Sequence, residues 1–541
     1  MTPGSRRPIA QGVASAALLI AAVTVLARLM GFARVIVFAR TVGPSCLGDT
    51  YYTANTLPNI VFDIVAGGAL SSLVVPVLAA PVADGDQTAV DRIASALLTW
   101  AGSILVPVAL VGAFLVHPMM RLLVGNGHAG CSAAAEVAVG ARMLLVFLPQ
   151  IVLYGIGVIL AGILQAHRRF LGPALGPLLS SLVVVGAYSL FAAVSSRRET
   201  DLSTLTRGHE LILSVGTTLG VVALVLPLLV PTARIGVRLR PTYRFPDGVS
   251  AIVWRMALSG ALVLGSQDLA TAVVIRLTNV QGSAGAVVLY NLAWTVFVLP
   301  WAVLAVPLAT SAFPGLTASW QRGDGERYAA TTASTVRVLL VAVAAAAAMM
   351  VVTAGPASRV VVLGAPGGAA PVVLARGLVC FAPGLLAYSL MALLSRALYA
   401  QGDARSPAFA TAAGWLVAIV VDIVLVAALP ATWAVAAVGI GSSVGLSLAA
   451  GWMLLILRRS AGSQSLAGTR RSSLAAAVGV VVSISLGALV AGAFPSGGVA
   501  HNLVVVVVLA ALVGVAYLAV VQALDRSTVR LIATRVRWRR A

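Results

Sequence analysis

The sequence predicts an all-α integral membrane protein with about 14 transmembrane helices. Hydrophobic residues make up 60% of the 541 residues and charged residues only 10%, whereas soluble domains carry about 25% charged residues. Apolar stretches of the roughly 20 residues that cross a bilayer recur from one end of the chain to the other. Backbone polar groups in lipid need internal partners, so unbroken apolar runs such as 503–512 predict helices and not alternating barrel strands.

We expect fourteen spans, an even number that places both termini on one side of the membrane. Their approximate ranges are 12–41, 51–81, 92–117, 135–166, 172–195, 209–231, 249–275, 284–314, 330–354, 372–399, 405–430, 433–458, 472–494 and 501–524. Only a short basic segment precedes the first span, which is long enough to be retained, so no cleavable signal peptide is expected.

The basic residues indicate which side the termini occupy. The net charge is +20, and all 36 basic residues are arginines. With the N-terminus inside, 22 arginines fall on the cytoplasmic side, 6 on the outer side and 8 within spans. An arginine excess in short loops marks the cytoplasmic face, so nucleic acid is not needed to explain the charge. The Arg-rich tail, 525–541, is expected to contact anionic lipids of the inner leaflet.

The chain also repeats itself. Residues 147–174 align without gaps on 381–408, and a weaker echo occurs at a slightly larger offset. The most informative pairs are Phe147/Phe381, Pro149/Pro383, Tyr154/Tyr388, Tyr52/Tyr290 and Pro76/Pro314. The offset moves each span onto another six helices later, so the repeat is parallel. We expect two six-helix lobes around a central cavity, with an N-lobe at 1–231, a C-lobe at 232–458 and two further helices at 459–524.

Arginines inside the first span are candidate ligands of an anionic substrate, because charges in the bilayer are costly and usually functional. Arg28 and Arg34 flank Gly31. Glycine permits unwinding, which would turn both guanidinium groups into one cavity. The planar fork of arginine suits phosphate. Arg40 is instead expected to extend toward the interface.

Acidic and amide residues follow in the second span. Asp49 either pairs with one of these arginines or is a solvated loop carboxylate. Asp63 follows Asn59 in the same span and is the expected counter-charge of the cavity.

Two further carboxylates, Asp268 and Asp422, lie deep in spans seven and eleven. A carboxylate at that depth binds a cation, carries a proton or pairs with an arginine. The candidate pairing partners are Arg255, Arg376 and Arg396.

The remaining chemistry-bearing residues favour no enzyme. Cys46, Cys131 and Cys380 are far apart and odd in number, so we expect inert thiols with no disulfide framework and no metal site. The five histidines do not cluster and no Walker-type loop occurs, so ATP hydrolysis is not expected.

Several motifs resemble those of the MurJ/MviN lipid II flippases, a family of the multidrug/oligosaccharidyl-lipid/polysaccharide exporter superfamily. They are Ala-Arg-Leu-Met-Gly-Phe-Ala-Arg at 27–34, Asp49, Ala-Asn-Thr-Leu-Pro-Asn at 54–59, Ala-Gly-Gly-Ala at 66–69, Val75-Pro76, Tyr290, Leu299-Pro300, Phe313-Pro314 and the segment 397–407. The resemblance covers most of the chain in span order. It implies two six-helix lobes plus two helices, in the bacterial cytoplasmic membrane with both termini cytoplasmic.

The resemblance also implies a function. Such a protein is a transporter and not an enzyme: it flips undecaprenyl-pyrophosphate carrying the peptidoglycan disaccharide-pentapeptide to the outer leaflet by alternating access, for cell-wall synthesis and cell shape. The family's cavity arginines correspond to Arg28 and Arg34, and its acidic loop residue to Asp49. The sequence departs from the family pattern at Val35, at Phe62 or Asp63, and at Thr295, so fewer cations are expected in the cavity.

The substrate-binding candidates are therefore Arg28, Arg34, Asp49, Asn59, Asp63 and Arg255, and the ion-coupling candidates are Asp268 and Asp422. No cofactor is expected; sodium, protons or the membrane potential are the candidate energy sources. Expected partners are the lipid-linked precursor, anionic lipids and cell-wall synthesis proteins. Two alternatives remain: a cation-coupled exporter of a drug or another polyprenyl-linked glycan, and a transport-inactive scaffold for cell-wall enzymes.

Overall fold

The computed structural model describes residues 7–64, 71–127, 130–195, 202–245, 249–494 and 497–538. Within these ranges the regular structure is helical throughout, and the chain divides into two compact units, Met1–Asp268 and Leu269–Ala541. The all-α prediction is confirmed. Each unit is a bundle of apolar helices joined by short turns.

In the described part of unit 1 there are eight α-helices and the first part of a ninth. They are α1 (Arg7–Thr41), α2 (Cys46–Phe62), α3 (Ser71–Asp84), α4 (Gln87–Val124), α5 (Ala133–Phe147), α6 (Pro149–Ala166), α7 (Leu171–Val194), α8 (Arg207–Arg234) and α9 (Val249–Gln281). Inside unit 1, α1 packs on α7, α7 packs on α8, and α2 packs on α5 and α6.

The described residues of unit 2 form the rest of α9 and nine further α-helices. They are α10 (Ala286–Pro300), α11 (Val306–Gln321), α12 (Gly325–Val362), α13 (Pro371–Ala400), α14 (Arg405–Ala428), α15 (Ala434–Ala461), α16 (Thr469–Gly492), α17 (Val499–Leu524) and α18 (Arg526–Trp538). A π-helical turn, Trp301–Ala305, joins α10 to α11, and α13 packs closely on both α12 and α15.

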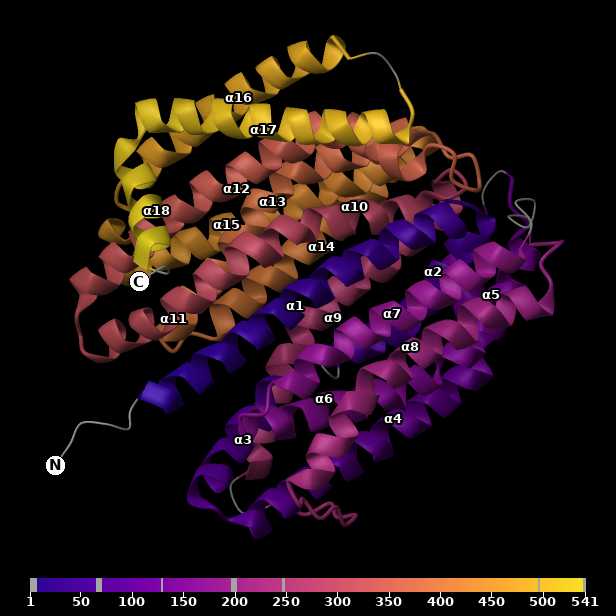
Figure 1. Cartoon of the computed structure of the whole chain (residues 1–541), viewed down its shortest axis with the longest axis horizontal. Coiled ribbons are helices and arrows are strands. Elements are labelled where there is room, and N and C mark those ends of the chain that lie inside the picture. Colours follow the sequence, from indigo (N-terminus) through magenta and orange to yellow (C-terminus); the bar gives the residue numbers. More distant parts are fainter. Residues whose placement is uncertain are drawn as a thin grey trace. The chain divides into compact units, whose positions relative to one another are not determined.

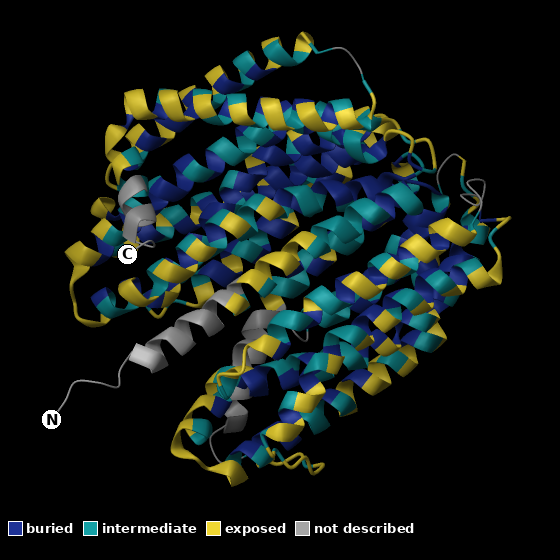
Figure 2. Ribbon diagram, in the orientation of Figure 1, coloured by how far each residue is buried: buried dark blue, intermediate teal, exposed yellow. Residues whose placement is uncertain are grey.

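Twelve helical segments of the described residues are long and apolar enough to cross a membrane. The total of fourteen spans remains a prediction. Figure 2 shows exposed residues along α17, and these residues are apolar, as in Leu503, Val507 and Val515. An exposed face of this kind suits lipid and not water.

The predicted repeat is visible in the helix bounds. Both α4 and α12 have 38 residues, begin 238 positions apart and are N-capped by equivalent aspartates, Asp86 and Asp324. The bounds of α7 coincide with those of α14 at an offset of 234. The turns before α7 and α14 also match, because Arg169 N donates to Leu164 O and Asp403 N donates to Leu398 O.

The repeated proline interrupts the two units differently. In unit 1, Pro149 opens α6 directly after α5 has ended. In unit 2, α13 continues through Pro383, where the Ser443 hydroxyl of α15 accepts from Gly384 N at 3.0 Å and donates to Cys380 O at 2.8 Å. A side chain inserted into the i to i−4 ladder typically marks a bend in a helix.

The last helices pack on the outer part of unit 2. Figure 1 shows α16 and α17 beside α12, and the three helices share two buried apolar clusters. The Tyr517 hydroxyl of α17 donates to Val341 O of α12 at 2.9 Å. A buried tyrosine hydroxyl with a partner fixes the register of the two helices.

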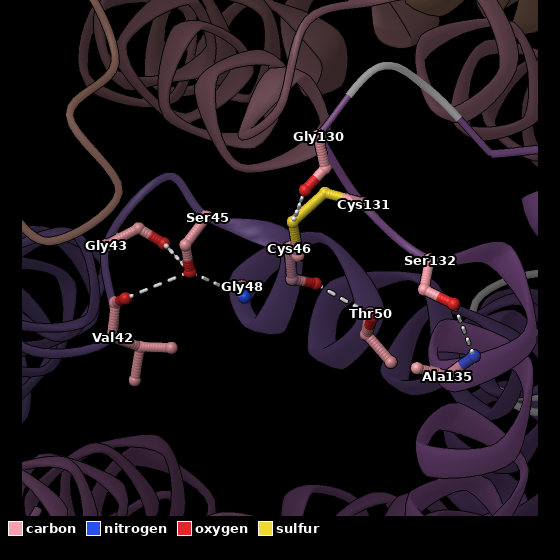
Figure 3. Close-up of a disulfide and its surroundings, with 10 residues drawn as sticks. All are labelled: Val42, Gly43, Ser45, Cys46, Gly48, Thr50, Gly130, Cys131, Ser132 and Ala135. Atoms are coloured by element: carbon pink, nitrogen blue, oxygen red, sulfur yellow. Dashed lines mark hydrogen bonds between the residues drawn. A yellow bond between two sulfur atoms is a disulfide. The ribbon is translucent and has the colours of Figure 1, made fainter. Parts of the chain in front are cut away.

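The expectation of unpaired thiols is wrong for two of the three cysteines. Cys46 and Cys131 form a disulfide with a Cα–Cα distance of 5.7 Å (Figure 3), and only Cys380 is free. The 85-residue separation hides this pairing in the sequence. The cysteines meet because α2 packs on α5. Ser45 and Ser132 cap these two helices, so the disulfide joins two capped helix N-termini.

Candidate functional site

The first helix places the two candidate arginines differently. Helix α1 runs without interruption through Gly31, so the expected unwinding there is wrong. In a continuous helix, residues six apart point about 120° away from each other. Accordingly, Arg28 is exposed whereas Arg34 is partly buried. The structure therefore brings only Arg34 into the polar cluster of unit 1.

Arg34 has four tyrosines as its electrostatic neighbours. We call this set the arginine–tyrosine cluster: Arg34 of α1, Tyr51 and Tyr52 of α2, Tyr154 of α6 and Tyr188 of α7. No carboxylate forms an ion pair with Arg34 in the described part of the chain. An arginine surrounded by hydroxyl groups retains its donors for an incoming anion.

Hydrogen bonds and ring contacts fix the tyrosines in place. The Tyr51 hydroxyl lies 2.7 Å from the Tyr188 hydroxyl and 2.6 Å from the Thr217 hydroxyl of α8. The Phe38 ring, one helical turn after Arg34, lies 4.6–5.1 Å from the rings of Tyr51, Tyr52 and Tyr188. The cluster is therefore held by four helices of unit 1 and does not depend on a loop.

A row of polar residues at i, i+4 spacing continues along α2. Tyr154 donates to Asn59 Oδ1 at 3.3 Å, and Asn59 Nδ2 donates to Asn55 O at 2.8 Å. Asn55 Oδ1 is buried without a hydrogen-bond partner among the described residues. Asp63 ends the helix and is partly buried. This row connects the cluster to one of the predicted carboxylates.

The other predicted residue of α2, Asp49, is fully buried in the first turn of the helix. The partial positive charge of a helix N-terminus stabilises a carboxylate there. Because Asp49 is buried in a helix, it is not a solvated loop carboxylate. The side chain of Arg255 lies outside the described residues.

Unit 2 contains a different kind of site. Asp422 of α14 is only 1% exposed, and neither of its carboxylate oxygens has a hydrogen-bond partner among the described groups. The two predicted arginine partners are engaged elsewhere: Arg376 lies 4.5 Å above the Trp433 ring, and Arg396 donates to Ala392 O. Pairing of Asp422 with Arg376 or Arg396 is therefore not observed among the described groups.

Asp268, near the end of unit 1, resembles Asp422 in its surroundings. It is 5% exposed, and its Oδ2 has no hydrogen-bond partner within the described ranges. Its carboxylate is an electrostatic neighbour of Asp63.

Sequence reasoning missed the tyrosines as site residues, although it identified Arg34. Tyr154 and Tyr188 lie in helices long and apolar enough to cross a membrane, and Tyr51 and Tyr52 lie in the shorter helix α2. A hydroxyl there needs a partner, since lipid offers none. Four tyrosines within the apolar spans of one half of the chain were the available signal.

Comparison with solved structures shows which known proteins share this fold. The fold matches "Lipid II flippase MurJ, inward closed conformation" with a TM-score of 0.69 and 17% identity, over 95% of this chain and 100% of that one. It also matches an inward-facing multidrug resistance MATE family transporter of the MOP superfamily, with a TM-score of 0.65 and 15% identity, over 82% and 96% of the two chains. The chain thus shares its fold with these two transporters.

The family follows from the sequence. The model of the family "Lipid II flippase MurJ" matches residues 38–518, and the chain belongs to this family. Lipid II flippase MurJ of Burkholderia cenocepacia is 31% identical over 176 residues, 32% of this chain and 33% of that protein. MurJ of Thermosipho africanus is 27% identical over 162 residues, 30% and 32% of the two chains. The chain therefore spans about a third of the length of the curated relatives it matches.

Proposed function

We propose that this protein flips lipid II, the lipid-linked peptidoglycan precursor, from the inner to the outer leaflet of the bacterial cytoplasmic membrane by alternating access. Arg34 binds the pyrophosphate of the substrate, and the surrounding tyrosine hydroxyls orient that group. The observation that carries this proposal is an arginine without a carboxylate partner, among four tyrosines, in a chain of the MurJ family.

The energetics support this role for Arg34. An arginine near the centre of a spanning helix costs about 2.5–3.5 kcal/mol on insertion scales. Each hydrogen bond to a charged group contributes about 1.5–3 kcal/mol, so one pyrophosphate engaged through two bonds offsets that cost. Arg28, six residues or about 1.7 turns earlier on α1, is the second expected ligand as the headgroup moves along the helix.

The disulfide supports the proposed orientation. The arginine distribution assigns the ends of α1 and α4 to the outside, and Cys46 and Cys131 follow those ends. Disulfides form and persist in oxidising compartments outside the cytoplasm. Both termini are then cytoplasmic, so the Arg-rich tail faces anionic inner-leaflet lipids and the cytoplasmic partners of cell-wall synthesis.

Asp268 and Asp422 are proposed to couple flipping to sodium, protons or the membrane potential. Both oxygens of Asp422 and one oxygen of Asp268 are buried without a hydrogen-bond partner among the described residues, an arrangement that favours a protonated or cation-bound carboxylate. Asp268→Asn and Asp422→Asn should therefore remove the dependence of flipping on sodium or on the potential. Asp84→Asn, at the exposed end of α3, is the control. Unchanged ion and potential dependence in both variants would refute coupling through these residues.

Flipping of lipid II by the purified protein in vesicles, together with complementation of flippase-depleted cells, tests the binding role. Arg34→Ala should reduce flipping by at least about 100-fold, the loss expected for two charged hydrogen bonds. Arg34→Lys should restore little, because an ammonium lacks the planar fork. The matched control is Arg121→Ala, an exposed arginine at the end of α4.

The same experiment separates the alternatives. A transport-inactive scaffold should complement with Arg34→Ala at matched expression. An exporter of another substrate should not flip lipid II even as the unmodified chain.

A further inference from the structure

A second polar site lies in unit 1, at the end of α4 that the arginine distribution assigns to the cytoplasm. The segment 238–243, between α8 and α9, has no regular secondary structure and runs along the first part of α4. Its backbone N–H groups donate to α4 side chains: Arg238 to Asp91 at 3.0 Å, Arg240 to Ser95 at 2.9 Å and Thr242 to Thr99 at 3.1 Å. We call this segment the strap.

The spacing of these three contacts indicates that the backbone of the strap is extended. Two residues of extended chain advance about 6.6 Å, and four residues of helix advance about 6 Å. Alternate strap residues therefore meet every fourth residue of α4. Residues two apart in an extended chain project to the same side, so the Arg238 and Arg240 side chains share one face of the strap.

This face opens into a cavity of about 390 Å³, within the range of about 300–1,000 Å³ typical of small-ligand pockets. Arg92, Arg238 and Arg240 line it, and all three are exposed. Their guanidinium groups form no ion pair in the described part of the chain. The one carboxylate of the pocket, Asp91, accepts from Arg238 N and from Gln87 Nε2. The pocket thus carries a net positive charge.

Aromatic residues place the pocket at the level of lipid headgroups. The Trp100 ring lies 5.3 Å from the Tyr243 ring, and its Nε1 donates to Tyr243 O. Tryptophan and tyrosine mark the membrane interface. The exposed apolar residues of α4 begin at Ile104. From Trp100 to Arg121 the helix advances about 30 Å, the thickness of the hydrocarbon core. Arg92 and the strap arginines then lie outside that core.

We propose that this pocket binds a phosphate group, presented by an anionic phospholipid of the inner leaflet. Three guanidinium groups supply forked donors for phosphate oxygens. The exposed Leu239 and Tyr243 on the strap contact the adjoining lipid. The site is separate from the arginine–tyrosine cluster and does not depend on the flipping function proposed above.

Lipid binding to the purified full-length chain, measured by native mass spectrometry in detergent, tests this site. Dioctanoyl-phosphatidylglycerol should bind the unmodified protein more tightly than dioctanoyl-phosphatidylcholine does. In the triple variant Arg92→Gln, Arg238→Gln, Arg240→Gln, its affinity should fall at least about tenfold. The matched control, Arg234→Gln with Arg244→Gln, removes two nearby arginines that do not line the pocket and should bind as the unmodified chain does. The strap should persist in the triple variant, because its bonds use backbone N–H groups.

Asp91→Asn is the complementary test. An asparagine oxygen still accepts from Arg238 N, but the negative charge is gone, so phosphatidylglycerol should bind several-fold more tightly. Inorganic phosphate distinguishes the sources: binding of free phosphate as tight as that of the lipid would identify a soluble anion as the ligand of the same site. Equal affinity in the triple variant and the unmodified chain would overturn the proposal. An equal loss in the control would also overturn it, because surface charge in general would then explain the binding.

Discussion

The two units use one helical template with different chemistry. Tyr154 of unit 1 and Tyr388 of unit 2 occupy equivalent positions of the repeat. Tyr154 is bonded to Asn59 and is an electrostatic neighbour of Arg34. The Tyr388 ring instead lies 4.9 Å from Trp301 and 5.8 Å from Phe297, in an aromatic cluster.

The different surroundings of these two tyrosines indicate that the two units bind different kinds of group. Matching caps, turns and helix lengths preserve the backbone, whereas the polar groups have diverged. Unit 1 has an unpaired guanidinium suited to an anion, and unit 2 has an unpartnered carboxylate, Asp422, suited to a cation or proton. Since the two units share the same helix pattern, substitutions at equivalent positions show how the function or stability of each unit depends on its own side chains.

The largest expected difference in stability comes from the disulfide, which only unit 1 has. Replacing Cys46 and Cys131 with serine should lower the free energy of unfolding by up to about 4 kcal/mol, because the bond closes a long loop. Thermal unfolding in detergent, with and without reductant, measures the loss. Cys380→Ala in unit 2 should leave the response to reductant unchanged. A melting temperature insensitive to reductant in the unmodified chain would show that the bond does not stabilise unit 1.

The sequence predicted the fold well where composition and repetition determine it. The expected span 172–195 coincides with α7 to within one residue, and the span 405–430 begins with α14. Within the expected span 51–81 the structure describes α2 up to Phe62 and α3 from Ser71, and residues 65–70 lie outside the described part of the chain. That span therefore stays a prediction.

The site was predicted less completely. Arg34 could be identified from the sequence because a charged residue within a span is costly and therefore usually functional. The tyrosines around it became visible only when α1, α2, α6 and α7 were brought together. The disulfide was missed for the same reason, because its cysteines meet through the packing of α2 on α5 and not through any spacing pattern.

Two helical glycines, one in each unit, differ in the space available for a side chain. A Cβ at Gly441 of unit 2 would overlap the Asp422 carboxylate, whereas a Cβ at Gly31 of unit 1 would meet no atom within 4 Å. Gly441→Ala should therefore cost about 1–3 kcal/mol, and Gly31→Ala should stabilise by about 0.5–1 kcal/mol. Thermal unfolding compares them. If Gly31→Ala also abolished flipping at normal abundance, α1 would have to unwind during transport.

The C-terminal hub, formed by Asp525, Ser472, Ser527 and Thr528, lies outside the repeat. Burial alone would raise the pKa of Asp525, but hydrogen bonds from the three hydroxyl-bearing residues outweigh it and lower the pKa to about 2. A depressed folded-state pKa stabilises above the ordinary value of 3.8 and loses its effect as the pH falls toward about 2.

Asp525→Asn should accordingly weaken the attachment of α18 at neutral pH by about 2 kcal/mol. Trypsin should cleave faster at Arg526 and Arg530, which follow the hub. The unmodified chain should show the same cleavage pattern at pH 5 and pH 8 once protease activity is normalised. A rate in Asp525→Asn equal to that of the unmodified chain would mean that packing of Val529 and Ile532 alone holds the helix.

The smallest effect lies in the turn that ends each copy of the repeated segment. Arg168 has φ 57° and its equivalent, Gly402, has φ 84°, with matching hydrogen bonds around both. A side chain in this left-handed region costs about 1–2 kcal/mol, whereas glycine adopts it freely but loses more entropy on folding. Arg168→Gly should therefore stabilise by about 0.5 kcal/mol and Gly402→Ala should destabilise by about 1 kcal/mol. No atom lies within 4 Å of a Cβ at Gly402, so the second value measures backbone strain alone. Arg168→Ala is the control, because it removes the guanidinium and retains the strained backbone. Equal destabilisation by Arg168→Gly and Arg168→Ala would contradict this expectation. The Arg168 side chain would then stabilise the turn by more than its strained backbone costs, through a contact that the Gly402 turn lacks.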